Sequence, residues 1–178
     1  THISAAAGAM TWMFYEWVKF GKPTALGSVT GMVAGLGTIT PASGFVGPAG
    51  ALVIGIIAGA VCFNAVIMIK QKFKIDDSLD VFPVHGVGGI CGTILVGFFA
   101  SKELGIFSGQ GGWSHEAIVI SDQLQIQLTA VVATAAYTAL ATFVILKIVD
   151  VVTGLRVDSQ TETQGLDLDS HGETGYNL

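Results

Sequence analysis

Long apolar stretches, separated by short polar or Gly/Pro-rich segments, set the pattern of this chain. The stretches cover about residues 2–18, 24–39, 46–69, 80–100 and 120–153. A helix needs about 20 predominantly apolar residues to cross the hydrocarbon core of a bilayer. The pattern therefore predicts an all-α fold, a polytopic transmembrane bundle of five helices over residues 1–156, followed by a tail over residues 157–178.

Composition and charge agree with this division. The 178 residues are 51% hydrophobic and only 12% charged, whereas soluble domains are about 25% charged. The tail holds five acidic residues and no Lys or Arg, so it accounts for the whole net charge of −5. The neutral bundle gives no indication of a nucleic-acid partner. The tail has so few apolar residues that we expect it to be disordered unless a partner or the inner face of a pore orders it.

The basic residues predict an orientation in the membrane. If the five helices alternate in direction, all but Lys102 fall on one side, namely Lys19, Lys22, Lys70, Lys72, Lys74, Lys147 and Arg156. Cytoplasmic loops carry an excess of Lys and Arg, so that side is predicted to be cytoplasmic. The N-terminus then lies outside and the acidic tail inside. Thr1 begins almost directly in an apolar stretch, with no initiator Met, so we expect a segment of a longer membrane protein.

The fourth stretch contains the most informative residue, His85. From Val81 to Ala100 the chain has 20 residues without Asp, Glu, Lys or Arg. At α-helical spacing, His85 shares a face with three glycines, Gly88, Gly89 and Gly92. These glycines either let another helix approach closely, with His85 bonding across the seam, or leave an open lane that His85 lines. We favour the lane, because ionisable groups inside membranes are usually functional.

Asp80 precedes His85 by five residues, which places it about 140° around an α-helix and away from the same face. We therefore expect Asp80 to mark the start of the helix, where its carboxylate accepts backbone N–H bonds and complements the positive dipole end. Pro83 falls in the first turn, where its missing N–H is tolerated.

Small residues predict how the helices pack. Gly27, Gly31 and Gly35 recur every four residues, as do Gly55 and Gly59, and such ridges allow tight helix contacts. Cys62 and Cys91 lie inside apolar runs and are interpreted as small buried hydrophobic residues, not as a disulfide or a metal pair. No metal site and no cofactor is expected.

Three segments resemble one known family in the same order along the chain. DVFPVHGVGGICGTILVGFFAS resembles the second-histidine helix of the Amt/Rh/MEP ammonium transporters, most closely the bacterial Amt branch. GMVAGLGTITPASGFVGPAGALVIGIIAG resembles the two preceding helices and their turn, and GLRVDSQTETQGLDLDSHGETGYNL the cytoplasmic C-terminal region. The likeness covers essentially the whole chain.

This resemblance implies an eleven-helix inverted-repeat fold, of which the five stretches correspond to helices seven to eleven. His85 then corresponds to the second of two paired pore histidines, Val81 to a pore-lining neighbour, and Asp80 to the acidic residue at the helix start. The first pore histidine, the phenylalanine gate and the Trp/Ser recruitment site of the family belong to the first six helices, outside the matched segments.

The resemblance also implies function and partners. We expect ammonium/ammonia transport through a hydrophobic pore in the cytoplasmic membrane, not an enzyme. The family further implies a homotrimer whose cytoplasmic tail takes part in regulation by a PII-type signal protein.

Two other classes are weaker interpretations of the same residues. A haem-binding subunit of a redox complex needs axial ligands, but bis-histidine ligation requires two histidines at similar depth and His85 alone lies deep in a stretch. An intramembrane protease could draw on Ser28, Ser43, Asp80 and His85, but no nucleophile elbow or two-acid pattern accompanies them.

Overall fold

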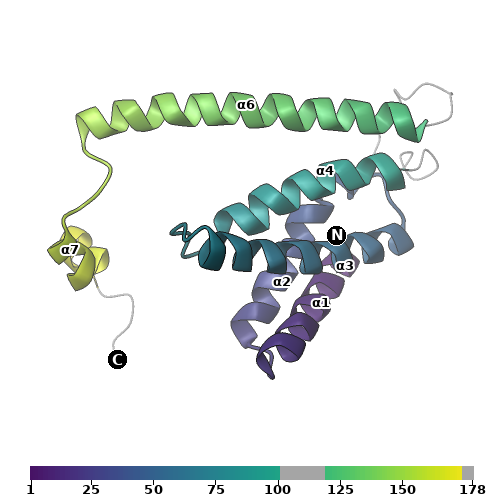
Figure 1. The fold of residues 1–178 in the computed structure, drawn as a ribbon, viewed down its shortest axis with the longest axis horizontal. Coiled ribbons are helices and arrows are strands. Elements are labelled where there is room, and N and C mark those ends of the chain that lie inside the picture. Colours follow the sequence, from purple (N-terminus) through teal and green to yellow (C-terminus); the bar gives the residue numbers. More distant parts are fainter. Residues whose placement is uncertain (101–118, 174–178) are drawn as a thin grey trace. The chain divides into compact units, whose positions relative to one another are not determined.

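The computed structural model describes residues 1–100 and 119–173, and every regular element in these ranges is helical, which confirms the all-α prediction (Figure 1). The α-helices are α1 (His2–Phe20), α2 (Ala25–Ile39), α3 (Pro48–Ile67), α4 (Gly88–Phe99), α6 (Ile120–Val152), α7 (Ser159–Gln164) and α8 (Leu166–His171). A 3₁₀ turn, η1 (Thr40–Ala42), extends α2. Two π-helical turns, η2 (Met68–Lys72) and η3 (Phe82–Val87), end α3 and precede α4.

Four helices of the described ranges are long and apolar enough to cross a membrane. They cover Ala25–Ala42, Pro48–Lys72, Phe82–Phe99 and Ile120–Val152. The first predicted span is also a helix, α1, but it is not among these four. Five spans therefore stay a prediction. Lys102, part of the orientation argument, and residues 174–178 of the tail lie outside the described residues.

The chain divides into two compact units, Thr1–Val132 and Ala133–Leu178. In the first unit, α1 packs against both α2 and α3, and α2 also contacts α3 and α4 (Figure 1).

Glycines make these contacts close. A Cβ on Gly35 of α2 or on Gly55 of α3 would run into the backbone carbonyl oxygen of Ser4 in α1. Ser4 is fully buried and its Oγ donates a 2.9 Å hydrogen bond to the carbonyl oxygen of Gly35. A Cβ on Gly59 would lie 2.8 Å from the carbonyl oxygen of Gly8. The glycine ridges thus form helix seams, as predicted.

Two apolar clusters fill the first unit. One consists of Trp12, Ala34, Cys62, Phe63 and Val84, with the Trp12 and Phe63 rings edge to face at 5.3 Å between centroids. The other consists of Ile39, Ala42, Ala51, Ile54 and Val96. Because Val84 belongs to the first cluster and to η3, it packs the turn that carries His85 against that cluster.

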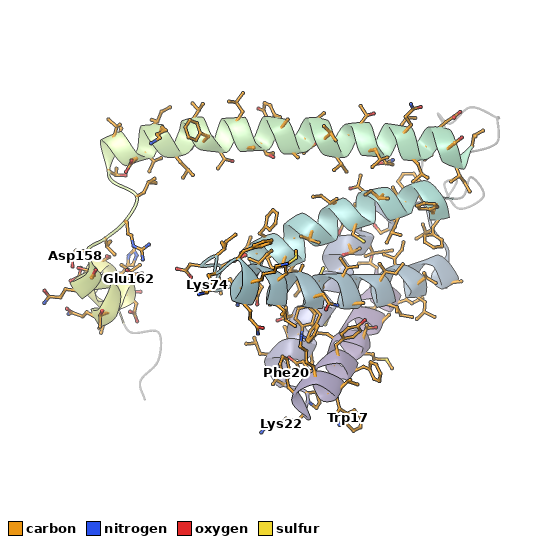
Figure 2. All side chains as sticks on the ribbon, viewed as in Figure 1. Trp17, Phe20, Lys22, Lys74, Asp158 and Glu162 are labelled. Carbon is orange, nitrogen blue, oxygen red and sulfur yellow. The ribbon has the colours of Figure 1, made fainter. Side chains whose placement is uncertain are left out.

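The C-terminal end of α1 has the character of a membrane interface. Gly21, with φ 82°, ends the helix by donating its N–H to the carbonyl oxygen of Trp17. Trp17 and Phe20 are 65% and 57% exposed, and Lys22 follows them at the same end (Figure 2). Exposed aromatic residues beside lysines are typical of the headgroup level of a bilayer.

Helix α6 confirms the longest predicted stretch. None of its 33 residues is buried, and Tyr137, Leu140 and Phe143 are each more than 60% exposed. At about 1.5 Å per residue the helix is about 50 Å long, more than the roughly 30 Å hydrocarbon core requires.

The tail differs from the expected disorder, because local polar contacts order it into two short helices. Asp158 caps α7 by accepting the N–H groups of Gln160 and Thr161 on Oδ1, at 2.9 and 3.0 Å (Figure 2). Arg156 Nη2 lies 2.9 and 3.0 Å from the two carboxylate oxygens of Glu162. Gly165, with φ 104°, makes the bend between α7 and α8.

Candidate functional site

His85 lies in the π-helical turn η3, which continues directly into α4. The turn is anchored by its own neighbours, since Pro83 and Val84 are buried while His85 is exposed. Val81, one turn earlier, is 52% exposed. Within the described residues, the imidazole is therefore presented outward on a backbone that the core holds in place.

The predicted glycine face divides into two parts. Gly88 and Gly92 are buried against α2: a Cβ on Gly88 would lie 2.9 Å from Thr38 Oγ1, and one on Gly92 would run into the Thr38 carbonyl oxygen. Gly89 has no heavy atom within 4 Å of the position of a Cβ. Because a π turn holds more residues than an α turn, positions counted from His85 at α spacing do not all share its side. Two of the glycines serve the helix seam, and the third stays open.

Helix α2 also passes close to the imidazole. A Cβ on Gly37 would lie 3.9 Å from His85 Nδ1 and 3.8 Å from the carbonyl oxygen of Val84. Any larger side chain at position 37 would occupy the space beside the ring. Cys62 of α3 also contacts this turn, with its Sγ 4.0 Å from the carbonyl oxygen of Val84.

Asp80 does not cap the helix in the way expected. The N–H groups of Val81 and Phe82 donate to Asp77 Oδ1 and Oδ2, at 2.9 and 2.8 Å. Asp80 itself has a left-handed backbone, φ 56°. The predicted capping role of Asp80 is wrong and belongs to Asp77, although Asp80 does mark the start of the helix by accepting the N–H of Val84 on its carbonyl oxygen.

The carboxylate of Asp80 is engaged by the end of α3 instead. Lys70 Nζ, from the π turn η2, lies 2.7 Å from Asp80 Oδ1. Both residues line a hollow of about 220 Å³ that also contacts Glu16 of α1. The sequence showed Lys70 only as one of several basic residues, and nothing in its spacing from Asp80 indicates the pair.

Glu16 is a second residue whose role the sequence analysis did not identify. It is only 9% exposed, and its Oε2 accepts the N–H of Thr24 at 2.7 Å. The Thr24 hydroxyl donates to the same carboxylate and accepts the N–H of Gly27, so Glu16 completes the N-terminal cap of α2. A threonine three residues before Gly27 is a recognisable cap, but its carboxylate partner comes from the preceding helix.

Cysteines and metal ligands offer no further chemistry in the described residues. Cys62 and Cys91 are both free thiols, Cys62 buried and Cys91 half-buried. Among residues 1–100 and 119–173, no group of three or more His, Cys, Asp or Glu side chains could hold a metal ion.

Curated ammonium transporters are similar in sequence to nearly the whole of this chain. The chain is 44% identical over 176 residues to an ammonium transporter of Bacillus subtilis, covering 99% of this chain and 43% of that protein. It is 45% identical over 176 residues to the ammonium transporter Amt1 of Archaeoglobus fulgidus, again covering 99% and 43%. The chain thus spans less than half the length of these relatives.

Solved structures show the same likeness in three dimensions. Mep2 of Saccharomyces cerevisiae superposes with a TM-score of 0.79 at 34% identity, covering 89% of this chain and 36% of Mep2. Mep2 of Candida albicans superposes with a TM-score of 0.77 at 32% identity, covering 96% and 38%. The profile of the Ammonium Transporter Family matches residues 1–176. By sequence and by fold, this chain belongs to the ammonium transporter family.

Proposed function

We propose that the full-length protein containing this chain carries ammonium or ammonia across a cell membrane through a hydrophobic pore, with His85 as the second of two paired pore histidines. Family membership supports the transport activity. The observation that supports the role of His85 is its exposure on a turn whose neighbours Pro83 and Val84 are buried, with only a glycine, Gly37 of α2, beside the ring.

Selectivity is the physical problem that such a pore solves. Ammonium and potassium have similar size and the same charge, so a wide aqueous channel would pass both. An apolar lane makes desolvation of either ion expensive. Ammonium can release a proton and cross as neutral ammonia, whereas potassium has no neutral form. The reaction balances as NH₄⁺ giving NH₃ and H⁺ on entry, and the two recombining on exit.

His85 suits the transfer of that proton. An imidazole has a pKa near neutrality in water, and each ring nitrogen can act as donor or acceptor. Val81, one turn before His85 and 52% exposed, would supply apolar lining beside it. In this proposal the two histidines pass the proton while ammonia moves along the lane.

The proposed transporter has a defined orientation, assembly and regulatory partner. The transporter lies in the cell membrane with Thr1 on the outer side and the tail on the cytoplasmic side, as the basic residues predict. It assembles as a homotrimer, and a PII-type signal protein binds its cytoplasmic face. The folded tail, with four exposed carboxylates between Asp158 and Asp169, is the candidate regulatory element.

Uptake into vesicles tests the transport activity. The full-length protein is reconstituted into liposomes, and entry of ¹⁵N-ammonium is compared with entry of a rubidium tracer, which stands in for potassium. We expect ammonium uptake well above protein-free vesicles and rubidium uptake at their level. Ammonium uptake no faster than in protein-free vesicles would refute the proposal.

The haem-binding alternative has no support from the relatives described above, which are named as transporters. An absorption spectrum separates the two functions directly. A Soret band that copurifies with the protein in stoichiometric amount would favour a redox subunit, and its absence removes that alternative.

A further inference from the structure

The ion pair between Lys70 and Asp80 joins the end of one helix to the start of the helix that carries His85. Lys70 Nζ lies 2.7 Å from Asp80 Oδ1, and the two side chains are 37% and 19% exposed. Oδ1 itself is buried from solvent. A partly buried charge pair is screened less than a surface pair, so its geometry is held more firmly.

The backbone at Asp80 decides where the next turn begins. Asp80 has φ 56°, a conformation that Asp and Asn adopt more readily than most residues. Its N–H donates to the carbonyl oxygen of Asp77 at 3.3 Å, and its carbonyl oxygen accepts the N–H of Val84 at 3.0 Å. The residue therefore closes the preceding turn and opens the next helix at the same time.

The turn that follows makes this starting point important for His85. Because η3 is π-helical, it contains one residue more per turn than an α-helix would. If the segment reverted to α geometry, the residues before the change would rotate relative to α4 by about 100°. His85 would then leave its place beside Gly37 of α2, where a Cβ would lie 3.9 Å from its Nδ1, although α4 itself could keep its seam with α2.

The partner in the ion pair also depends on a π turn. Lys70 lies within η2, whose closing bond runs from the N–H of Phe73 to the carbonyl oxygen of Met68, at 3.0 Å. Two unusual turns, one on each side of the loop, are thus connected by one ion pair. This is the arrangement expected where a fold holds a strained segment in a defined position.

We propose that Lys70 and Asp80 are positioning residues, whose ion pair keeps η3 in its π-helical form and thereby holds the exposed His85 ring beside Gly37 of α2. Neither residue touches the permeating molecule in this account. The inference rests on the proposed function for its consequence in transport, but its structural part can be tested separately.

The test uses substitutions that remove charge and leave shape nearly unchanged. Asp80→Asn keeps a residue that tolerates the left-handed backbone, and Lys70→Gln keeps a long side chain. Lys70→Arg retains the positive charge. Lys72→Gln is the matched control, since Lys72 lies on the same turn and forms no ion pair with any described residue.

Two readouts are taken on the full-length protein in liposomes. The first is the rate at which diethyl pyrocarbonate modifies His85, resolved from the other histidines by mass spectrometry. The second is ¹⁵N-ammonium uptake, with thermal unfolding as the check on folding. We expect Asp80→Asn and Lys70→Gln to slow modification of His85 and to lower uptake by about tenfold or more, because small displacements of a reacting group are costly. Lys70→Arg and Lys72→Gln should resemble the wild type.

The outcomes distinguish failure of the proposed transport function from failure of the proposed positioning of His85. Wild-type protein without ammonium uptake would refute the proposed function, and the modification rate alone would then decide the positioning role. If Asp80→Asn fails to fold, Lys70→Gln decides. An unchanged modification rate of His85 in a folded charge-removing variant would overturn the inference, even if the thermal midpoint fell.

Discussion

Gly92 of α4 lies so close to the backbone of Thr38 in α2 that a single added methyl group would overlap the Thr38 carbonyl oxygen. Three residues earlier on the same helix, Gly89 has open space where a Cβ would be. The two glycines of one predicted stripe therefore have different surroundings: Gly92 brings two helices together and Gly89 faces open space.

This contrast predicts opposite effects on stability. Gly92→Ala should destabilise the protein by about 1–3 kcal/mol, because the backbone at Thr38 cannot move aside as a flexible side chain could. Gly89→Ala should leave stability unchanged or raise it slightly, since alanine favours helix over glycine by about 1 kcal/mol. Thermal midpoints of the two variants in the same detergent check this. Equal losses at both positions would contradict the division of the stripe.

A glycine beside His85 predicts an effect on transport. A Cβ on Gly37 would lie 3.9 Å from His85 Nδ1, so Gly37→Leu places a branched side chain beside the ring, and we expect ammonium uptake to be strongly reduced. Uptake by the vesicle assay, normalised to the amount of folded protein, is the measurement. A folded Gly37→Leu variant that transports at the wild-type rate would show that the space beside the His85 ring is not part of the path.

The buried carboxylate of Glu16 gives a prediction at the other end of α2. Glu16→Ala removes the acceptor of the Thr24 N–H, and leaving such a group unpaired costs about 1–3 kcal/mol. Glu162→Ala is the matched control, because its pair with Arg156 is exposed and surface pairs contribute about 0–1 kcal/mol. Chemical or thermal unfolding of both variants compares them. A smaller loss for Glu16→Ala than for Glu162→Ala would contradict the capping role.

The tail offers a prediction in pH. Backbone N–H groups of Thr161 and Gln160, together with the Thr161 hydroxyl, lower the pKa of the Asp158 carboxyl from its ordinary value of 3.8. A carboxylate whose pKa is lowered on folding stabilises the folded form above the ordinary pKa, and this contribution disappears as the pH falls through the lowered value. We therefore expect α7 to keep its cap at neutral pH and to fray only in acid, below the ordinary carboxyl pKa of 3.8.

Amide chemical shifts of Gln160 and Thr161 follow this change residue by residue. Asp158→Ala should show frayed shifts already at pH 7, whereas Asp158→Asn, which retains an acceptor oxygen, should stay capped in acid. Wild-type shifts at pH 7 that already match those of Asp158→Ala would argue against the cap.

Hydrophobic length predicted most of the fold. The expected stretches at 24–39 and 120–153 agree closely with α2 (Ala25–Ile39) and α6 (Ile120–Val152), because spans of apolar residues leave few alternatives. The tail was not predicted, since its order comes from short-range polar contacts such as the cap at Asp158 and not from apolar burial.

The site was predicted less completely, for reasons of local geometry. The sequence identified His85 but assumed α-helical spacing, whereas His85 lies in the π turn η3 and the three glycines lie in α4, of which Gly88 and Gly92 face α2 and Gly89 faces open space. Both Asp77 and Asp80 carry the carboxylate that a cap needs, and only the hydrogen bonds from the N–H groups of Val81 and Phe82 show that Asp77 is the acceptor. The ion pair between Lys70 and Asp80 joins two different helices, so the spacing of residues along one helix could not predict it.

The ratio of ammonium to potassium flux in the full-length protein tests the role of His85 most directly. His85→Ala is compared with the wild type and with His2→Ala, an exposed histidine at the start of α1, as the control. The account predicts that His85→Ala either stops ammonium uptake or admits potassium, while His2→Ala keeps the wild-type ratio. A His85→Ala protein with wild-type ammonium flux and full exclusion of potassium would contradict it.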